Sequence, residues 1–265
     1  MVDWNDPVLE ARLATLSVQL LYFILGLYSW EYVRSLHVEI ALLRRQLAFR
    51  WALLSYITAR FSFLIATVLL VMQSSPFHTR VDCQSLITFI TFATNVAVDC
   101  SATNLMIRTW IIWTNSYLLR LLLVLLSLGH WTINTLFLAT IRASTTNGMC
   151  IITSINPAYA SAGVIYSMFH DLLLLVFTVV GLWRMSSSST LWKLLVKQGV
   201  IYFIINLVVK IILLALNRLN LNNIMNVIFA MPASCICTIA SSQVVLSLLR
   251  PSPNHESDNA PPVKA

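Results

Sequence analysis

Long apolar stretches recur along the whole 265-residue chain, and they constrain its fold more than any other feature. A helix of about 20 apolar residues, at ~1.5 Å per residue, crosses the ~30 Å hydrocarbon layer of a bilayer. The stretches are continuous rather than alternating, which argues against a transmembrane barrel. Charged residues make up only 10% of the sequence, too few to cover a soluble domain of this size. The sequence therefore predicts an all-α, multi-pass membrane protein.

The apolar pattern predicts a bundle of seven transmembrane helices. Their approximate bounds are 13–33, 51–72, 86–107, 119–141, 161–183, 196–216 and 224–248. The chain then divides into an extracytoplasmic segment at 1–12, a transmembrane domain at 13–248, and a tail at 249–265. The tail is polar and rich in proline, so we expect it to be disordered in the cytoplasm.

Basic residues gather in the short loops on one side of the predicted bundle. Eleven lysines and arginines follow odd-numbered spans, whereas four precede span one or follow even-numbered spans. The positive-inside rule then places the N-terminus outside and the C-terminus in the cytoplasm. The net charge of +7 is thus spread over membrane-facing loops. This distribution indicates a lipid bilayer as partner and no nucleic acid.

Two of the five cysteines lie on the predicted outer side, where disulfides can form. Cys83 comes just before span three, and Cys150 lies in the loop before span five. We expect a disulfide that ties this loop to the third helix; the alternative is a pair of free thiols.

Polar side chains repeat at one spacing inside the apolar spans. The pairs stand four residues apart, and so each lies on one helix face: Tyr56 and Arg60, Asn95 and Asp99, His130 and Asn134, Ser167 and Asp171, Asn206 and Lys210. A single polar stripe on an apolar helix faces the bundle interior rather than lipid. The candidate residues for a polar site inside the bundle are Arg60, Asn95, Asp99, His130, Asn134, Asp171, Asn206 and Lys210.

Depth in the membrane predicts which charges meet. Arg60 and Asp99 lie ~13 and ~12 Å from the inner face, while Lys210 and Asp171 lie ~20 and ~18 Å from it. We therefore predict two buried ion pairs, Arg60–Asp99 and Asp171–Lys210, with His130 near the first. These pairs serve either to fix helix register or to line a site for a polar ligand or ion.

Two local features carry structural expectations. The segment from Arg34 to Trp51 is amphiphilic and basic, which predicts a short interfacial helix. Pro232 falls inside the seventh predicted span, where it should kink the helix.

Motifs of enzymes and of known receptor classes are missing. The histidines are scattered and form no metal-binding box, and no glycine-rich phosphate loop occurs. We predict no enzyme activity, no catalytic residues, no metal and no cofactor. Span seven holds no lysine for a retinal Schiff base, and span three does not end in an acid–arginine–aromatic triplet.

Several stretches in order resemble a family of uncharacterised seven-helix membrane proteins that is expanded in mushroom-forming basidiomycete fungi. They are LGLYSWEYVRSLHVEIALLRRQLAFRW, the pair Cys83–Gln84, LMIRTWIIWTNS, LGHWTINTLFL, CIITSINPAY, HDLLLLVFTVVGLWR, LWKLLVKQGVIYF and LNLNNIMNVIFAMPA. The resemblance covers nearly all of residues 10–250. It implies a membrane location and seven helices, and it implies no activity, substrate or cofactor.

The functional hypothesis is a receptor-like sensor with a polar site inside the helix bundle. It would bind a small molecule and reside in the plasma membrane or another membrane of the secretory pathway. The alternatives are a transporter of small solutes or ions, and a structural membrane subunit. A transporter should show broken helices or internal repeats, and we find no convincing repeat.

Overall fold

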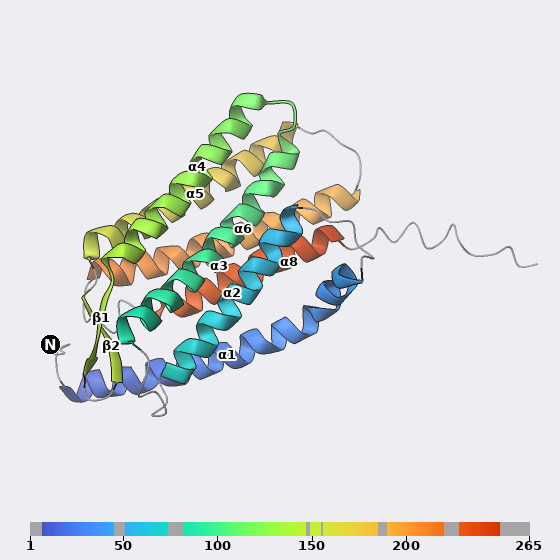
Figure 1. Ribbon diagram of the computed structural model, residues 1–265. Coiled ribbons are helices and arrows are strands. Elements are labelled where there is room, and N and C mark those ends of the chain that lie inside the picture. Colours follow the sequence, from blue (N-terminus) through green and yellow to red (C-terminus); the bar gives the residue numbers. More distant parts are fainter. Residues whose placement is uncertain are drawn as a thin grey trace, which may run out of the picture.

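Seven helices make up nearly all of the structure that is described here. A computed structural model of the chain describes residues 7–44, 51–73, 82–146, 149–154, 156–184, 190–219 and 228–249. Its helices are α1 (Pro7–Leu43), α2 (Trp51–Gln73), α3 (Cys83–Ile112), α4 (Tyr117–Thr140), α5 (Pro157–Arg184), α6 (Thr190–Leu219) and α8 (Ala230–Leu249). Figure 1 shows them as one bundle. Each predicted span overlaps one of these helices, so the all-α prediction is confirmed.

The helices α1 to α5 are long and apolar enough to cross a bilayer. Within the described residues, α6 and α8 carry shorter apolar runs, Val200–Leu216 and Ala230–Leu246. Large apolar side chains such as Phe23, Phe61 and Leu128 are more than half exposed on the outside of the bundle. An apolar exterior around a polar interior is the pattern of a multi-pass membrane protein. The orientation of the bundle in the membrane remains a prediction. The disorder of the tail at 249–265 also remains a prediction, since residues 250–265 lie outside the described part.

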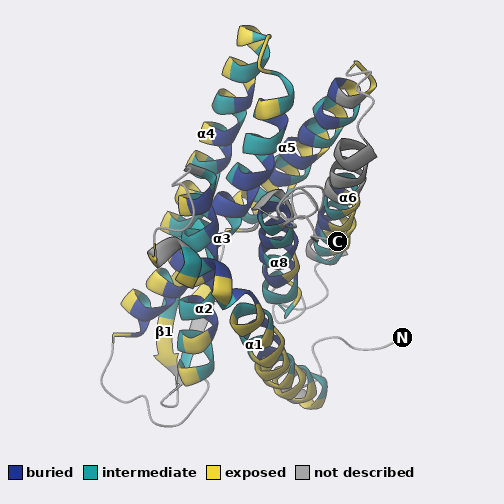
Figure 2. Cartoon of the chain, turned by 90° about the vertical axis from the view of Figure 1, so that its right-hand side faces the viewer, coloured by how far each residue is buried: buried dark blue, intermediate teal, exposed yellow. Residues whose placement is uncertain are grey.

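Helix α3 lies at the centre of the bundle. Within the described residues, it packs against α2, α4, α5 and α8, whereas α1 packs mainly against α2 and α8. In Figure 2 the residues coloured as buried are concentrated along α3 and on the helix faces turned toward it. Two apolar clusters fill the interior: Ile24, Tyr28, Phe63, Ala97 and Cys235 in one, and Leu105, Leu123, Leu174, Phe203 and Val244 in the other. Polar groups on α3 can therefore reach several helices at once.

A β-hairpin that the sequence analysis did not predict covers one end of α3. Its strands are β1 (Arg142–Thr146) and β2 (Met149–Ser154), paired antiparallel. Cys150 on β2 forms a disulfide with Cys83 at the start of α3, so the predicted bridge is confirmed. Gln84 adds two hydrogen bonds, accepting from the Ala143 amide at 2.7 Å and donating to the Ile141 carbonyl at 3.1 Å. These bonds hold the hairpin against α3.

Asp82 caps the N-terminus of α3 at the same end of the bundle. Its Oδ2 accepts from the Ser85 hydroxyl at 2.6 Å and from the Ser85 amide at 3.0 Å. These hydrogen bonds favour the ionised carboxylate, and they lower the pKa of Asp82 from its usual 3.8.

One local prediction is wrong. No separate interfacial helix begins at Arg34, because α1 continues unbroken to Leu43. Its sequence holds no proline after Pro7, so nothing stops the helix near residue 33.

The kink expected at Pro232 stays a prediction, because residues 224–227 of that span lie outside the described part. Within the described residues, a turn at Phe229 separates the helical Ile228 from the start of α8 at Ala230. This interruption comes just before the proline, where a proline is expected to disturb a helix.

Candidate polar site inside the bundle

The ion pair between Asp171 on α5 and Lys210 on α6 is confirmed. Lys210 Nζ donates to Asp171 Oδ2 and to Ser167 Oγ, both at 2.6 Å. Asp171 is 2% exposed and Lys210 is 7% exposed. Because neither charge reaches water or lipid headgroups, each depends on the other for compensation.

The predicted pair between Arg60 and Asp99 is wrong. Arg60 on α2 instead places Nη1 2.9 Å from Oε1 of Glu39, a residue of α1. The cause is the length of α1, which extends well beyond residue 33 and carries Glu39 alongside Arg60. A sequence reading that kept this helix running to Leu43 would have offered Glu39 as the partner.

Aromatic side chains enclose the Arg60 guanidinium. Nη1 donates to the Tyr56 hydroxyl at 2.5 Å, and Nη2 donates to the Tyr32 carbonyl at 2.8 Å. The guanidinium carbon lies 4.4 Å from the Tyr32 ring centre, a cation–π distance. Tyr28 donates to the carbonyl of Arg60 at 3.0 Å. Arg60 therefore joins α1 to α2 and takes no part in the contacts of Asp99.

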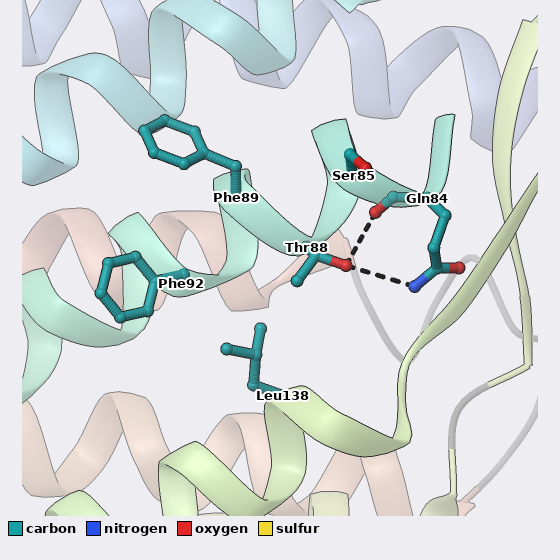
Figure 3. Close-up of a pocket in the computed structure, with 6 residues that line it drawn as sticks. All are labelled: Gln84, Ser85, Thr88, Phe89, Phe92 and Leu138. Atoms are coloured by element: carbon teal, nitrogen blue, oxygen red, sulfur yellow. Dashed lines mark hydrogen bonds between the residues drawn. The ribbon is translucent and has the colours of Figure 1, made fainter. Parts of the chain in front are cut away.

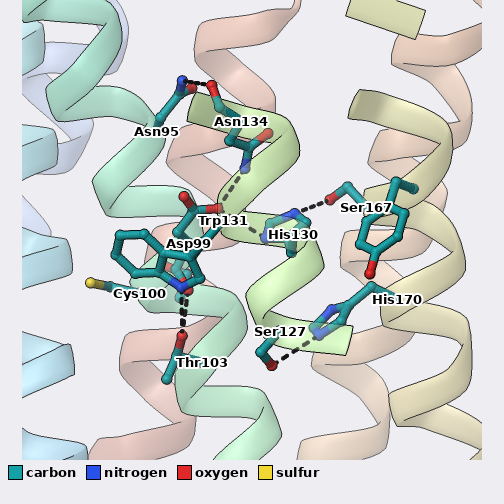
Figure 4. A network of polar contacts seen from close by, with 12 residues as sticks. Asn95, Asp99, Cys100, Thr103, Ser127, His130, Trp131, Asn134, Ser167 and His170 are labelled. Atoms are coloured by element: carbon teal, nitrogen blue, oxygen red, sulfur yellow. Dashed lines mark hydrogen bonds and ion pairs between the residues drawn. The ribbon is translucent and has the colours of Figure 1, made fainter. Parts of the chain in front are cut away.

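Asp99 on α3 meets α4 instead of α2. Its Oδ1 accepts from Asn134 Nδ2 at 2.5 Å and lies 2.9 Å from His130 Nδ1 (Figure 4). The histidine contact is at ion-pair distance, although it lies off the line of a good hydrogen bond. Both contacts fall on Oδ1, and Oδ2 accepts no hydrogen bond from any residue in the described part of the chain. One carboxylate oxygen is thus left for another partner.

Asp99 and the Asp171–Lys210 pair belong to one connected network. The far nitrogen of His130, Nε2, lies 3.1 Å from Ser167 Oγ, the same hydroxyl that Lys210 contacts. The path from Asp99 through His130, Ser167 and Lys210 to Asp171 crosses α3, α4, α5 and α6. Figure 4 shows its Asp99, His130 and Ser167 members together in the interior. We refer to these five residues as the buried relay.

Lys210 sets one hydrogen bond of the buried relay. Its ammonium group has only protons to donate, so Ser167 Oγ accepts from it. Ser167 Oγ keeps a second lone pair and its own proton for the contact with His130 Nε2 at 3.1 Å. The buried relay holds two carboxylates and one ammonium group. The ammonium group contacts Asp171, so Asp99 has no ammonium partner within the buried relay.

The sequence analysis gave no role to two further residues beside the buried relay. His170 on α5 stacks on His130 with ring centres 5.3 Å apart, and its Nδ1 lies 3.5 Å from Asp171 Oδ1. Its Nε2 lies 3.4 Å from Ser127 Oγ on α4. His170 stands one residue outside the stripe, whose spacing of four could not include it. Among the described residues, no group of three or more metal-binding side chains occurs.

The remaining candidates divide into two groups. Asn95 joins the site, since its Nδ2 donates to the Asn134 carbonyl at 3.1 Å. Asn206 is buried one turn from Lys210, but its Oδ1 has no hydrogen-bond partner among the described residues. The structure thus brings six of the candidates together: Asn95, Asp99, His130, Asn134, Asp171 and Lys210. The other two candidates, Arg60 and Asn206, take no part in the contacts among these six.

A groove on the outer surface of α3 and α4 leads toward Asp99. Its wider part, near the disulfide end, is a hollow of about 440 Å³ lined by Gln84, Ser85, Thr88, Phe89, Phe92 and Leu138 (Figure 3). A smaller cavity of about 20 Å³ shares Phe92 and Leu138 with it and reaches Asn95, Asp99 and Trp131. That volume holds one water or a group of similar size. We call the two cavities together the α3–α4 groove.

Comparison with models of known protein families finds no matching family, and comparison with curated protein sequences finds no significant match. The resemblance to the basidiomycete family stays a prediction. The argument for function therefore depends on the site alone.

Proposed function

We propose that this protein is a receptor-like membrane sensor. A small ligand would enter the α3–α4 groove, contact Asp99, and change the packing of α4 against α5 and α6 through the buried relay. The observation that carries the proposal is the continuity of contacts from a groove-lining carboxylate to a buried ion pair on other helices.

The connection through Ser167 supports a signalling role. Ser167 is the contact point of both His130 on α4 and Lys210 on α6. A new charge or donor at Asp99 would alter the hydrogen bond that His130 makes, and Ser167 would pass that change to Lys210. A buried polar network with one member at a groove offers the differential contact that a ligand needs to shift a conformational equilibrium.

The shape of the helices disfavours transport of the inverted-repeat type. Such transporters use discontinuous helices whose broken ends bind the solute. Helices α1 to α6 run without interruption within their described bounds, so the turn at Phe229 before α8 has no paired break in them. The Asp171–Lys210 end of the buried relay is packed, since Asp171 is 2% and Lys210 is 7% exposed.

The proposal is tested by a distance measurement. Spin labels at Leu118→Cys on α4 and Trp183→Cys on α5 replace side chains that are 80% and 85% exposed. Their separation is measured by pulsed electron paramagnetic resonance in nanodiscs, with and without compounds that raise the thermal stability of the protein. A stabilising compound that binds at Asp99 should change the separation.

The control severs the buried relay. Ser167→Ala removes the hydroxyl between His130 and Lys210, whereas Ser234→Ala removes a hydroxyl that bonds only within α8. Ser167→Ala should retain ligand binding and lose the change in separation; Ser234→Ala should lose neither. An unchanged separation in the wild type with the site occupied would refute the sensor.

A second candidate is a proton-coupled transporter, which the continuous chain of hydrogen-bonding groups in the buried relay favours. Each member of the buried relay can pass a proton to the next. Proteoliposomes with an internal pH dye would show proton uptake driven by a membrane potential, and Ser167→Ala would abolish it. Uptake equal to that of empty liposomes would leave the sensor as the better account.

A further inference from the structure

We propose that the α3–α4 groove binds a long-chain primary amine from the bilayer, with its ammonium group at Asp99. The inference rests on the proposed function, because it names the class of ligand that the sensing site takes. Four observations carry it: a carboxylate oxygen without a hydrogen-bond partner in the described residues, the lack of an ammonium partner for that carboxylate within the buried relay, aromatic neighbours, and the two unequal cavities of the groove.

Charge complementarity selects a cation. Oδ2 of Asp99 has no hydrogen-bond partner among the described residues, and Asp99 is buried, with 3% of its surface exposed. Of the two carboxylates of the buried relay, Asp171 contacts an ammonium group and Asp99 does not. An ammonium at Oδ2 would supply Asp99 with both a hydrogen-bond donor and a positive charge.

The lining of the small cavity fits an ammonium group. Phe92 and Trp131 line it together with Asp99, and aromatic faces attract cations. The cavity also includes Asn95 and Thr135, whose side chains can accept hydrogen bonds from a primary amine. A carboxylate beside aromatic rings is a common way to bind an organic cation.

Cavity size selects a primary amine over a quaternary one. About 20 Å³ accommodates a group the size of water, and an –NH₃⁺ group is comparably small. A trimethylammonium group is several times larger and has no proton to donate to Oδ2. A fatty acid would not bind in this way either, because its carboxylate has no proton to donate to Oδ2 and would repel Asp99.

The wide part of the groove fits an alkyl chain. Phe89 and Phe92 are each 50% exposed on the bilayer side, so the hollow of about 440 Å³ opens sideways toward lipid. From Ser85 to Asp99 the helix rises ~21 Å, which is longer than an extended dodecylamine chain. Lipid tails are as apolar as this lining, so the chain brings the ligand to the groove and the ammonium group supplies the selectivity.

The test is equilibrium binding of radiolabelled dodecylamine to the full-length protein in phosphatidylcholine nanodiscs, with empty nanodiscs as background. We expect saturable binding above background. Unlabelled dodecylamine should compete, whereas dodecyltrimethylammonium and dodecanoate should not. Asp99→Asn should weaken binding about tenfold or more, the effect of losing a hydrogen bond to a charged group.

A second variant keeps every charge in place. Val96 lines the small cavity, so Val96→Phe should fill it and abolish saturable binding. Val68→Phe makes the same change on the lipid-facing side of α2 and should leave binding intact. Equal competition by the quaternary amine, or unchanged binding in both Asp99→Asn and Val96→Phe, would overturn the proposal.

The outcome also separates the ligand class from the sensor. Amine binding at Asp99 without a change in the Leu118–Trp183 label distance would overturn the proposed function and leave the amine site standing. A change in the label distance caused by a ligand of another class, with no saturable amine binding, would overturn the amine site and leave the proposed sensor standing.

Discussion

Replacing Lys210 with methionine should destabilise the bundle by about 3–5 kcal/mol. Methionine preserves most of the side-chain volume and removes the charge, so the change strands the Asp171 carboxylate in the interior. Asp171 is 2% exposed, and the only cation that contacts it within the described residues is Lys210 at 2.6 Å. His170 lies farther away, at 3.5 Å.

The magnitude follows from what each variant leaves behind. Single hydrogen bonds inside membrane proteins contribute ~0.6 kcal/mol on average, which is too little to account for a loss of several kcal/mol. An uncompensated buried charge costs about 3–5 kcal/mol, because desolvation is no longer offset. The double variant Asp171→Leu with Lys210→Met removes both charges and should lie within about 1–2 kcal/mol of the wild type.

The assay is reversible unfolding in mixed micelles, applied to the wild type, Asp171→Leu, Lys210→Met and the double variant. The double-mutant cycle should give a coupling energy of about 2 kcal/mol or more. A control pair at Phe61 and Leu128, both lipid-facing, should show no coupling. A cost below about 1 kcal/mol for Lys210→Met would refute the reasoning, since Asp171 would then have another source of compensation.

Three further predictions concern other parts of the bundle. Reversing the charge of Arg60 alone should reduce expression, and adding Glu39→Arg should restore part of it; no recovery would contradict the pairing. Cys83→Ser should raise the number of thiols alkylated under denaturing, non-reducing conditions from three to four, because it frees Cys150; five alkylated thiols in the wild type would mean that no bridge existed. The ionised Asp82 stabilises the start of α3, and the lowered pKa means that this contribution persists above 3.8 and disappears as pH falls through the folded-state pKa. An NMR titration of its carboxyl carbon that gives 3.8 or higher would contradict the cap.

The sequence could predict those parts of the fold that hydrophobicity alone determines. Apolar runs located every helix, and the spacing of four residues identified which side chains turn inward. The Asp171–Lys210 pair followed from depth, because both helices have clear ends on the predicted inner side. The disulfide followed from the side of the membrane on which Cys83 and Cys150 were expected.

The remaining features depend on which helices are neighbours. The depth of a residue in the membrane does not show which helix lies beside it. Arg60 and Asp99 do share a level, yet α1 supplies Glu39 to the arginine and α4 supplies His130 to the carboxylate. The end of α1 was placed at residue 33 because charges begin there, although no residue in that stretch breaks a helix. The β-hairpin was missed because its strands are short, at five and six residues.

The most direct test of the central claim is the energetic coupling between Asp99 and Lys210. They lie on α3 and α6, and in the described part of the chain His130 and Ser167 connect them. Unfolding measurements on Asp99→Asn, Lys210→Met and their combination should depart from additivity by more than 0.5 kcal/mol, the usual scatter for independent sites. The departure should shrink in a Ser167→Ala background. Additive effects in the wild-type background would contradict a relay that joins the groove to the buried ion pair.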